Sequence, residues 1–238
     1  MKIIGIDSSG LVASVAYLED GIIKGNLSVN YQKTHSQTLL PMLDELVRTL
    51  DIELKNIDCI AVANGPGSFT GLRIGVATVK GLGLSIKKDL VGVSTLEALA
   101  INWQGVSGVV CPIMDARRSQ VYTAVYKFND NLPESSVVVE PDSMMIEDLC
   151  TKLESIGEKV YFTGDGVPVY RKYIEENLKV PFVFPTAANM YQNAANVAIL
   201  GEYYASKGFV TKACDLTPVY LRKPQAERER EEKLNDNR

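Results

Sequence analysis

A glycine-rich stretch from Asp58 to Ile86 constrains this chain more than any other segment, and it reads DCIAVANGPGSFTGLRIGVATVKGLGLSI. Ile57 to Ala63 is predicted to be a short buried strand, because apolar residues there are followed by a Gly/Pro cluster. The tight turn at 65–67 requires glycine, since glycine alone takes positive φ at low cost. From about Thr70 the apolar spacing becomes helical, so the stretch predicts a strand, a turn and a helix.

The predicted helix carries four glycines, Gly71, Gly75, Gly81 and Gly83. Each costs roughly 1 kcal/mol relative to alanine, so something in the structure must offset them. Gly71, Gly75, Thr78 and Gly81 recur at helical spacing and make one face nearly flat. Three roles fit a flat face: packing on a sheet within one domain, an interface with a partner's helix, or an anion site at the helix N-terminus.

Composition bounds the class of protein. At 238 residues and 46% apolar content, the chain suits one large or two small domains. A net charge of −4 gives it no strong attraction to nucleic acid. The four cysteines lie far apart, as expected of reduced thiols. With no signal peptide and no apolar run long enough to span a membrane, we expect a soluble, cytoplasmic protein.

The first half of the chain predicts a mixed sheet with helices on its faces. Lys2–Asp7, Leu11–Leu18 and Ile22–Val29 are predicted to form an antiparallel meander. A helix capped by Ser36 or Thr38 follows, with Pro41 in its first turn.

This helix has a wide apolar arc of about 160°, against the ~100° that a surface helix needs to cover its own core. The excess suggests that it covers a second surface. The arc is formed by Leu39, Leu40, Met42, Leu43, Leu46, Val47 and Leu50.

Beyond the glycine helix, Leu90–Val93 is predicted to be a strand, and Ser94 with Glu97 forms a capping box that opens a helix. The strand and helix order indicates domains at 1–105 and 106–225, with a charged, solvated tail at 226–238. We expect the last helix of the second domain to pack back on the first. The second half predicts strands at Val109–Met114, Val121–Phe128, Val137–Glu140 and Lys159–Phe162, and helices from Asp142 or Ser143, at Val167–Asn177 and at Tyr191–Lys207.

Asp7, Ser8 and Ser9 end the first strand with a carboxylate and two hydroxyls in a turn. Such turns are common, so alone they are weak evidence for a metal–phosphate site. Joined to the βββαβα order, the arrangement resembles the actin/Hsp70/sugar-kinase (ASKHA) fold. That resemblance implies two related α/β domains that clasp a nucleotide, each contributing a hairpin.

One branch of this superfamily is much more similar. Five segments carry the resemblance: MKIIGIDSSG at the start, HSQTLLPML at 35–43, NGPGSFTGLRIG at 64–75, MDARRSQVY at 114–122 and PVYLR at 218–222. Together they resemble the TsaB (YeaZ) family, which acts in making threonylcarbamoyladenosine beside the anticodon of tRNA. The resemblance covers nearly the whole chain to about Arg222.

The resemblance implies a non-catalytic scaffold that binds and activates TsaD, the catalytic paralogue, with the ATPase TsaE as a further subunit. The acidic balance of the chain predicts contact with tRNA only through the complex, and the lack of a long apolar run predicts no membrane association. An apolar patch on its helices predicts a homodimer when the partner is missing. No cofactor of its own is implied, and any nucleotide contact would fall at the partner interface.

One observation supports a non-catalytic role. The paralogue's His-x-x-x-His metal pair matches Thr95 and Leu99 here, and neither replaces imidazole as a metal ligand. His35 is the only histidine in the chain, so one subunit cannot build a two-histidine site. We expect His35 to serve in a cap or turn, or else at the interface.

The second hairpin also departs from an ATP-clasping pattern. Asp115 is followed by Ala116, Arg117 and Arg118, where small residues would let backbone approach a phosphate. Arginines still bind anions, so the candidate nucleotide contacts are Asp7, Ser8, Ser9, Arg117 and Arg118.

We predict that the first helix and the glycine helix together form the partner interface, docking a related subunit into a four-helix bundle. Two alternatives remain: an active ATP-dependent kinase or carbamoyl transferase of the same fold, and a metallopeptidase, which the lack of paired histidines disfavours. The predicted interface residues are Leu39, Leu43, Leu46, Leu50, Gly71, Ile74, Gly75, Thr78 and Gly81.

Overall fold

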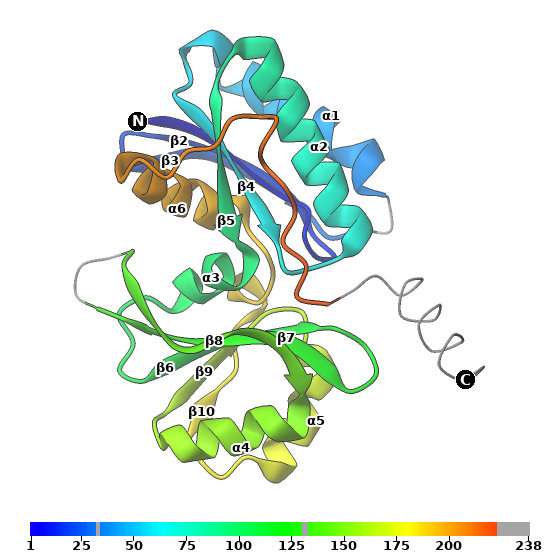
Figure 1. The fold of residues 1–238 in the computed structure, drawn as a ribbon, viewed down its shortest axis with the longest axis vertical. Coiled ribbons are helices and arrows are strands. Elements are labelled where there is room, and N and C mark those ends of the chain that lie inside the picture. The colour runs from blue at the N-terminus through cyan, green and yellow to red at the C-terminus, as the bar shows by residue number, and fades with distance from the viewer. Residues whose placement is uncertain (32–33, 130–132, 223–238) are drawn as a thin grey trace.

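The computed structural model describes residues 1–31, 34–129 and 133–222. They form two lobes stacked along the long axis of the molecule, each built on one sheet (Figure 1). The predicted tail at 226–238 lies outside the described residues, as does the predicted end of the second domain at residue 225.

The first sheet has the strand order β3-β2-β1-β4-β5. β1 is antiparallel to β2 and β2 to β3, while β4 and β5 are added in parallel. The predicted meander is therefore confirmed, with β2 beginning at Ala13 instead of Leu11. The strands are β1 (Lys2–Asp7), β2 (Ala13–Glu19), β3 (Ile22–Val29), β4 (Cys59–Gly65) and β5 (Asp89–Ser94).

The second sheet repeats this topology, with the order β8-β7-β6-β9-β10 when read from its antiparallel edge. Two mixed sheets flanked by helices confirm the predicted α/β fold class. The strands are β6 (Val109–Asp115), β7 (Gln120–Phe128), β8 (Ser135–Met145), β9 (Val160–Thr163) and β10 (Phe182–Val183).

Helices cover both faces of the first sheet. α1 (His35–Thr49) and α2 (Phe69–Ile86) lie side by side on one face, and α6 (Ala194–Ser206) packs on the other (Figure 1). α3 (Thr95–Ala100) lies between the lobes and contacts strands of both sheets. The remaining helices are α4 (Ile146–Ile156), α5 (Val167–Asn177) and the short 3-10 turns η1 (Leu54–Asn56), η2 (Ile101–Trp103) and η3 (Ala187–Asn189).

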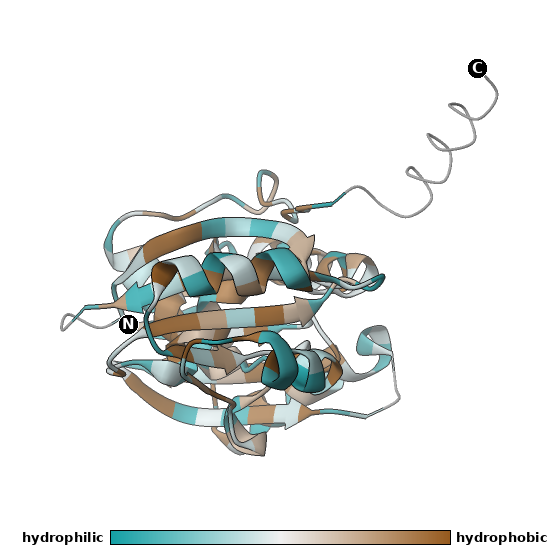
Figure 2. Cartoon of the chain, turned by 90° about the horizontal axis from the view of Figure 1, so that it is seen from below, coloured by the Kyte–Doolittle hydropathy of each residue, from teal (hydrophilic) through white to brown (hydrophobic). Residues whose placement is uncertain are grey.

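The period-2 alternation of β1 explains how one strand serves two cores. Ile4 and Ile6 join the apolar cluster under α1 and α2, whereas Ile3 joins the cluster under α6. The helices of the second lobe, nearest the viewer in Figure 2, alternate hydrophobic and hydrophilic bands, as amphipathic helices on a sheet do.

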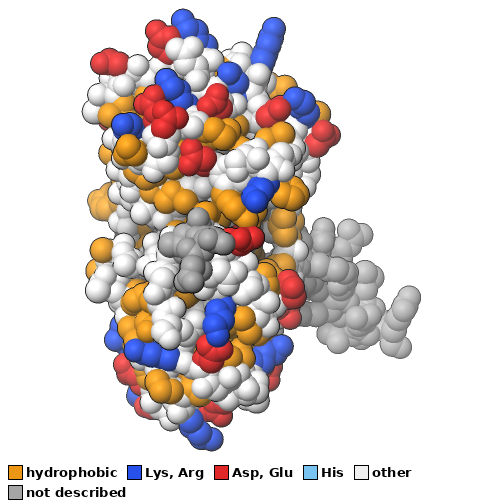
Figure 3. Space-filling model, turned by 90° about the vertical axis from the view of Figure 1, so that its left-hand side faces the viewer, with side chains coloured by type: hydrophobic (Ala, Val, Ile, Leu, Met, Phe, Trp, Pro, Cys, Tyr) orange, Lys and Arg blue, Asp and Glu red, His pale blue; other side chains and the backbone are white. Residues whose placement is uncertain are grey.

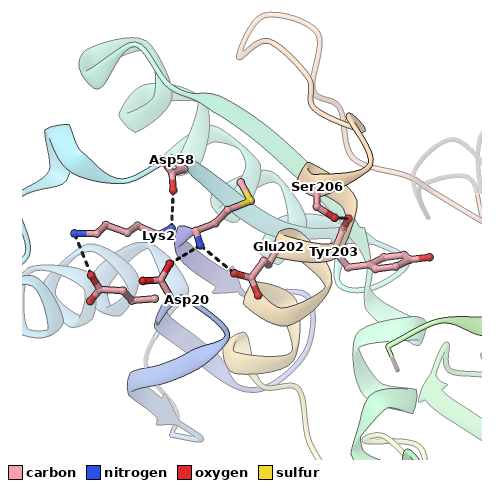
Figure 4. A network of polar contacts seen from close by, with 8 residues as sticks. Lys2, Asp20, Asp58, Glu202, Tyr203 and Ser206 are labelled. Atoms are coloured by element: carbon pink, nitrogen blue, oxygen red, sulfur yellow. Dashed lines mark hydrogen bonds and ion pairs between the residues drawn. The ribbon is translucent and has the colours of Figure 1, made fainter. Parts of the chain in front are cut away.

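A polar network ties the start of β1 to α6 (Figure 4). The Met1 ammonium lies 2.9 Å from Asp20 and 3.3 Å from Glu202 of α6. The Lys2 backbone N–H donates to the Asp58 carboxylate at 2.7 Å. The helix from the far end of the chain is thereby held to the first strand.

Two predicted helix starts are wrong. α1 begins at His35 with Thr34 as its N-cap, so Pro41 lies in the second turn and not the first. Pro41 is tolerated because it and Gln37, whose carbonyl loses a donor, are both exposed to solvent.

In the second lobe, β8 continues to Met145 and α4 begins at Ile146. Asp142 and Ser143 pair with Thr123 and Tyr122 of β7 and do not cap a helix. Pairing with a long neighbouring strand has overridden the local capping signal.

Basic and acidic side chains of the described residues are interspersed over both lobes on the face shown in Figure 3, while apolar side chains gather around the waist. Within the described part of the chain, no helix has the length and apolar character needed to cross a membrane.

Candidate functional site

The hairpin between β1 and β2 points into the space between the lobes and is built around Asp7. Its Oδ1 accepts hydrogen bonds from the Ser9 backbone N–H at 2.8 Å and the Ser9 hydroxyl at 2.6 Å. Its Oδ2 is buried without a hydrogen-bond partner among the described residues. Burial raises the pKa of Asp7 from 3.8 to about 6, and the bonds from Ser9 and the charge of His35 oppose that rise.

The glycine motif holds the start of α2 against this hairpin. A Cβ on Gly71 would lie 2.2 Å from the Ser8 carbonyl oxygen, and one on Gly67 would lie 2.3 Å from the Ser9 carbonyl oxygen. A Cβ on Gly75 would lie 2.4 Å from the Ser8 hydroxyl oxygen. All three contacts are too close for any side chain, so these glycines are needed for packing within the chain.

Hydrogen bonds complete the junction between the hairpin and α2. The Ser8 hydroxyl donates to the Gly71 carbonyl at 2.9 Å, and the Ser68 N–H donates to the Ser9 carbonyl at 2.7 Å. The Ser68 hydroxyl caps the helix by accepting from the Gly71 N–H at 3.3 Å. His35 Nε2 lies 2.8 Å from the Gly10 carbonyl oxygen, joining the start of α1 to the same hairpin.

The hairpin between β6 and β7 occupies the equivalent place in the second lobe. Asp115 Oδ1 accepts from the Arg117 N–H at 2.9 Å and the Tyr170 hydroxyl at 3.1 Å. Arg117, Arg118 and Ser119 have φ of 62°, 55° and 59° and are exposed. Three consecutive left-handed residues without glycine are costly, so contacts elsewhere must hold this hairpin.

A loop after β9 brings a further carboxylate to this hairpin. Cβ atoms on the flanking Gly164 and Gly166 would lie 2.2 and 2.9 Å from the Ile113 carbonyl oxygen, so the loop packs directly on β6. The Asp165 it carries has a buried Oδ1 without a partner among the described residues. Burial raises the pKa of Asp165 to about 6. The Asp115 backbone and Gln192 oppose this rise by hydrogen bonding, whereas the charge of Asp115 adds to it.

The two hairpins and the Asp165 loop border a cavity of about 560 Å³ between the lobes. The first turn of α2 and residues 220–222 of the chain form the rest of its wall. Its polar and aromatic lining residues include Ser9, Ser68, Phe69, Asp115, Arg117, Tyr122, Asp165, Tyr220 and Arg222.

Two of the five residues predicted to contact a nucleotide line the cavity, and three do not. Ser9 and Arg117 line the cavity, from opposite lobes. Asp7 and Ser8 are buried and hold the hairpin and α2 together, and the exposed Arg118 is not part of the cavity lining. The cavity therefore presents hydroxyls, carboxylates and arginines that suit a polar ligand.

Thr95 and Leu99, which the family resemblance matches to the paralogue's histidine pair, are both buried in α3. Leu99 belongs to an apolar cluster between the lobes. Among the described residues, no group of three or more His, Cys, Asp and Glu is arranged to hold a metal ion.

The predicted partner interface needs correction on α1. Leu39, Leu43 and Leu46 are at most 4% exposed and belong to the core under the sheet, and Leu50 is half-buried against that core. The wide apolar arc is covered by β2, β3 and α2, because α1 packs on all three. Leu40, at 52% exposure, is the apolar residue of this arc that faces solvent.

On α2 the prediction also needs correction, because the predicted interface glycines are not all exposed. Gly71 and Gly75 are buried against the first hairpin, whereas Gly81 is exposed and Ile74 and Thr78 are half-buried. The exposed face of α2 carries small residues flanked by larger apolar ones: Ile74, Ala77, Thr78, Gly81 and Leu84.

Sequence reasoning missed Asp165, Gln192 and Tyr170. The Gly164-Asp165-Gly166 triplet was the available signal, since glycines on both sides of an Asp indicate close backbone approach. Nothing local marked Gln192 or Tyr170, because tertiary structure alone brings them to the Asp165 loop and the second hairpin.

Comparisons with known proteins agree on one family. The family described as "TsaD: tRNA N6-adenosine threonylcarbamoyltransferase" matches residues 27–230. The TsaB protein of Bacillus subtilis, named a tRNA threonylcarbamoyladenosine biosynthesis protein, is 33% identical over 95% of this chain and 96% of its own. The Escherichia coli TsaB protein is 35% identical over 60% of this chain and 64% of its own.

Solved structures support the same assignment. YeaZ from Pseudomonas aeruginosa superposes with a TM-score of 0.78 at 26% identity, covering 92% of this chain and 99% of that one. The two-domain actin-like (ASKHA) architecture that the sequence predicts is thus the architecture of the chain.

Proposed function

The chain belongs to the TsaB family, and we propose that it is a non-catalytic subunit that binds and activates TsaD in forming threonylcarbamoyladenosine in tRNA. One observation carries the proposal. Thr95 and Leu99, at the positions of the paralogue's histidine pair, are packed into the core of this chain. Neither side chain reaches solvent, so a metal–substrate complex has no access to this place.

A reconstitution experiment tests the proposal. This chain, the TsaD paralogue from the same genome, and both together are incubated with tRNA and the threonylcarbamoyl donor. Threonylcarbamoyladenosine is then measured by mass spectrometry. We expect no product from this chain alone, with or without added zinc or iron, and much more product from the pair than from TsaD alone.

Two results would overturn the proposal. Product from this chain alone would show an active transferase, and equal product with and without it would show that it activates nothing. Titration of the isolated chain with ATP–Mg adds an independent check, because micromolar binding with turnover would favour the kinase or carbamoyl transferase alternative.

We place the docking surface on the exposed face of α2 next to Leu40 of α1. Ala77 and Gly81 are one helical turn apart on this face, so a partner's helix can approach closely between Ile74 and Leu84. An exposed apolar area of this kind favours self-pairing when the partner is missing. A homodimer in isolation, competing with the TsaD heterodimer, follows from the same surface.

Gly75→Leu is unsuitable as a test of this surface, because its side chain would collide with Ser8 inside the chain. Ala77→Arg is better, since Ala77 is exposed and the change leaves the core intact. We expect Ala77→Arg to abolish co-elution with TsaD and to make the isolated protein monomeric. Thr151→Arg, an exposed position on α4 of the other lobe, is the matched control and should leave both assemblies unchanged. Wild-type affinity of folded Ala77→Arg for TsaD would place the interface elsewhere.

The proposal extends to the rest of the complex. TsaE would join the TsaB–TsaD pair, and tRNA would be bound mainly through the partner, in line with the net charge of −4 on this chain. We expect the isolated protein to bind tRNA only weakly. A sub-micromolar dissociation constant at physiological salt, measured by fluorescence anisotropy, would contradict this.

A further inference from the structure

The last described residues of the chain, Thr217–Arg222, cross from the first lobe to the second at the mouth of the cavity. We call this segment the strap. In Figure 1 it is the orange-to-red trace that descends past α2 toward the second lobe. Tyr220, Leu221 and Arg222 form part of the cavity wall.

Backbone contacts fix the start of the strap to the first lobe. The Val219 N–H donates to the Asn64 carbonyl at 2.7 Å, and Asn64 Nδ2 donates to the Thr217 carbonyl at 3.4 Å. Gly65 permits this approach, since a Cβ there would lie 2.1 Å from the Val219 carbonyl oxygen. The strap therefore lies directly on the end of β4.

Side chains of α2 hold the middle of the strap. The Tyr220 ring packs on the Phe69 ring with centroids 5.0 Å apart, and the Tyr220 hydroxyl accepts from Arg73 Nε at 3.2 Å. The Arg73 guanidinium lies 3.9 Å from the centroid of the Phe69 ring. This stacked set anchors the strap to the first turns of α2.

The end of the strap reaches the second lobe. Arg222 Nη1 donates to the Ala116 carbonyl at 3.0 Å. Ala116 directly precedes three residues with positive φ, so Arg222 binds the start of this strained hairpin.

Further contacts between the lobes lie near α3. Trp103 Nε1 of η2 donates to the Phe162 carbonyl at 2.9 Å, and Glu97 of α3 accepts from Ser135 and Tyr204. None of these residues lines the cavity.

Beside the cavity, the Gln192 side chain also links the lobes, because it packs on Gly10 of the first hairpin and lies against Asp165 of the second lobe. The strap adds a further tie across the opening of the cavity.

We propose that the strap is a latch: Arg222 closes the cavity by holding the second hairpin to the first lobe, and its release opens the cavity. On release, Val219 and Tyr220 stay on the first lobe while the hairpin at 116–119 moves away. Opening would give the unpartnered Asp165 Oδ1 access to solvent. This proposal concerns the isolated chain and does not depend on TsaD.

Hydrogen exchange of the second hairpin tests the latch. In the closed state the Ala116 and Gln120 N–H groups bond within the hairpin and the Arg117 N–H bonds Asp115. We expect Arg222→Ala to speed the exchange of these amides at least tenfold, with the amides of β6 and β9 unchanged. The matched control is Lys212→Ala, which removes the same charge from the same terminal segment but breaks only an ion pair to Asp89 in the first lobe. Unchanged hairpin exchange in Arg222→Ala would overturn the proposal.

Thiol reactivity tests the closure itself. Asp165→Cys places a thiol in the cavity wall, and Cys214→Ser removes the exposed cysteine, leaving three buried ones. In this background, Arg222→Ala should raise the rate of labelling by Ellman's reagent at least tenfold, whereas Lys212→Ala should not. Equal rates with and without Arg222 would show that the strap does not close the cavity. Circular dichroism establishes that each variant is folded.

Discussion

The hairpins of the two lobes occupy equivalent places but are held in opposite ways. Each joins the first two strands of its sheet and borders the same cavity. The first, around Asp7, is buried under α2, whereas the second, from Asp115 to Gln120, is largely exposed.

The first hairpin is fixed by the absence of side chains. Gly67, Gly71 and Gly75 bring α2 so close that the carbonyls of Ser8 and Ser9 touch the helix. The second hairpin is instead held by side chains. Tyr170 donates to the Gln120 carbonyl at one end, and Arg222 donates to the Ala116 carbonyl at the other. A duplicated topology has thus given one rigid junction and one hairpin that can be released.

This difference shows how a motif that suggests chemistry can serve packing. A glycine-rich turn before a helix, beside an Asp and two Ser, fits a phosphate site equally well from the sequence. Burial decides between the two roles, because Ser8 and one carboxylate oxygen of Asp7 form hydrogen bonds within the chain and both residues are shielded from solvent.

The largest effect is expected from Gly71→Ala, which disturbs the contact between the first hairpin and α2. We expect it to lower the free energy of unfolding by about 3 kcal/mol, because the new Cβ would collide with the Ser8 carbonyl oxygen. Gly81→Ala in the same helix is the control. It meets no atom within 4 Å and should raise stability by up to about 1 kcal/mol through helix propensity. Urea unfolding of both variants measures the contrast, and equal effects would contradict the packing role of Gly71.

The second test uses the pKa of Asp7, which burial raises to about 6. Between pH 4 and 6 the folded state holds a proton that the unfolded state has lost, so stability falls as pH rises through this range. From pH 5 to pH 8 the loss is about 1.5 kcal/mol for this group. We expect Asp7→Asn to remove that part of the fall, leaving the similar part due to Asp165.

Asp44→Asn is the matched control for this pH dependence, because Asp44 is exposed on α1 and forms a surface ion pair with Arg48. Its unfolding free energy should keep the wild-type slope between pH 5 and 8. If Asp7→Asn keeps that slope too, Asp7 does not titrate in this range and its burial costs less than the structure indicates.

The third test loosens the second hairpin. Tyr170→Phe removes hydrogen bonds to Asp115 and to the Gln120 carbonyl and should cost about 1 kcal/mol of stability. Tyr173→Phe, one turn along α5, should change stability by less than about 0.5 kcal/mol. Thermal unfolding of the two variants distinguishes them, and equal midpoints would show that Tyr170 does not hold the hairpin.

The smallest effect concerns backbone strain. Arg118 has a φ of 55°, which glycine adopts without cost and a β-branched residue resists. We expect Arg118→Gly to raise the free energy of unfolding by about 0.5 kcal/mol and Arg118→Val to lower it by about 1 kcal/mol. A reversed order in urea unfolding would mean that this residue does not keep a positive φ in solution.

Local periodicity and turn chemistry by themselves determined the elements of the fold. The meander of three strands, the strand before the glycine turn and the helix at Val167–Asn177 follow from spacing and turn residues, and all are present. The predicted start of α4 was wrong, because β8 pairs with β7 past Asp142 and Ser143 and so overrides their capping tendency.

The sequence also predicted that the glycine helix packs against a close neighbour. Each glycine costs roughly 1 kcal/mol of helix stability relative to alanine, and close packing offsets that cost. Only the tertiary structure decided what that neighbour is. The Ser8–Ser9 turn lies more than fifty residues upstream along the chain, and no local pattern records a contact over that separation.

Neither the cavity nor the strap could be predicted from the sequence, because both depend on the tertiary structure. Asp165, Gln192 and Arg222 come from separate parts of the chain. Burial leaves polar atoms of Asp165 and Gln192 without partners, whereas Arg222 bonds the second hairpin. A sequence states which groups can donate, accept or carry charge. Which of them meet is set by the packing of two sheets against each other, because that packing alone brings distant residues within hydrogen-bonding distance.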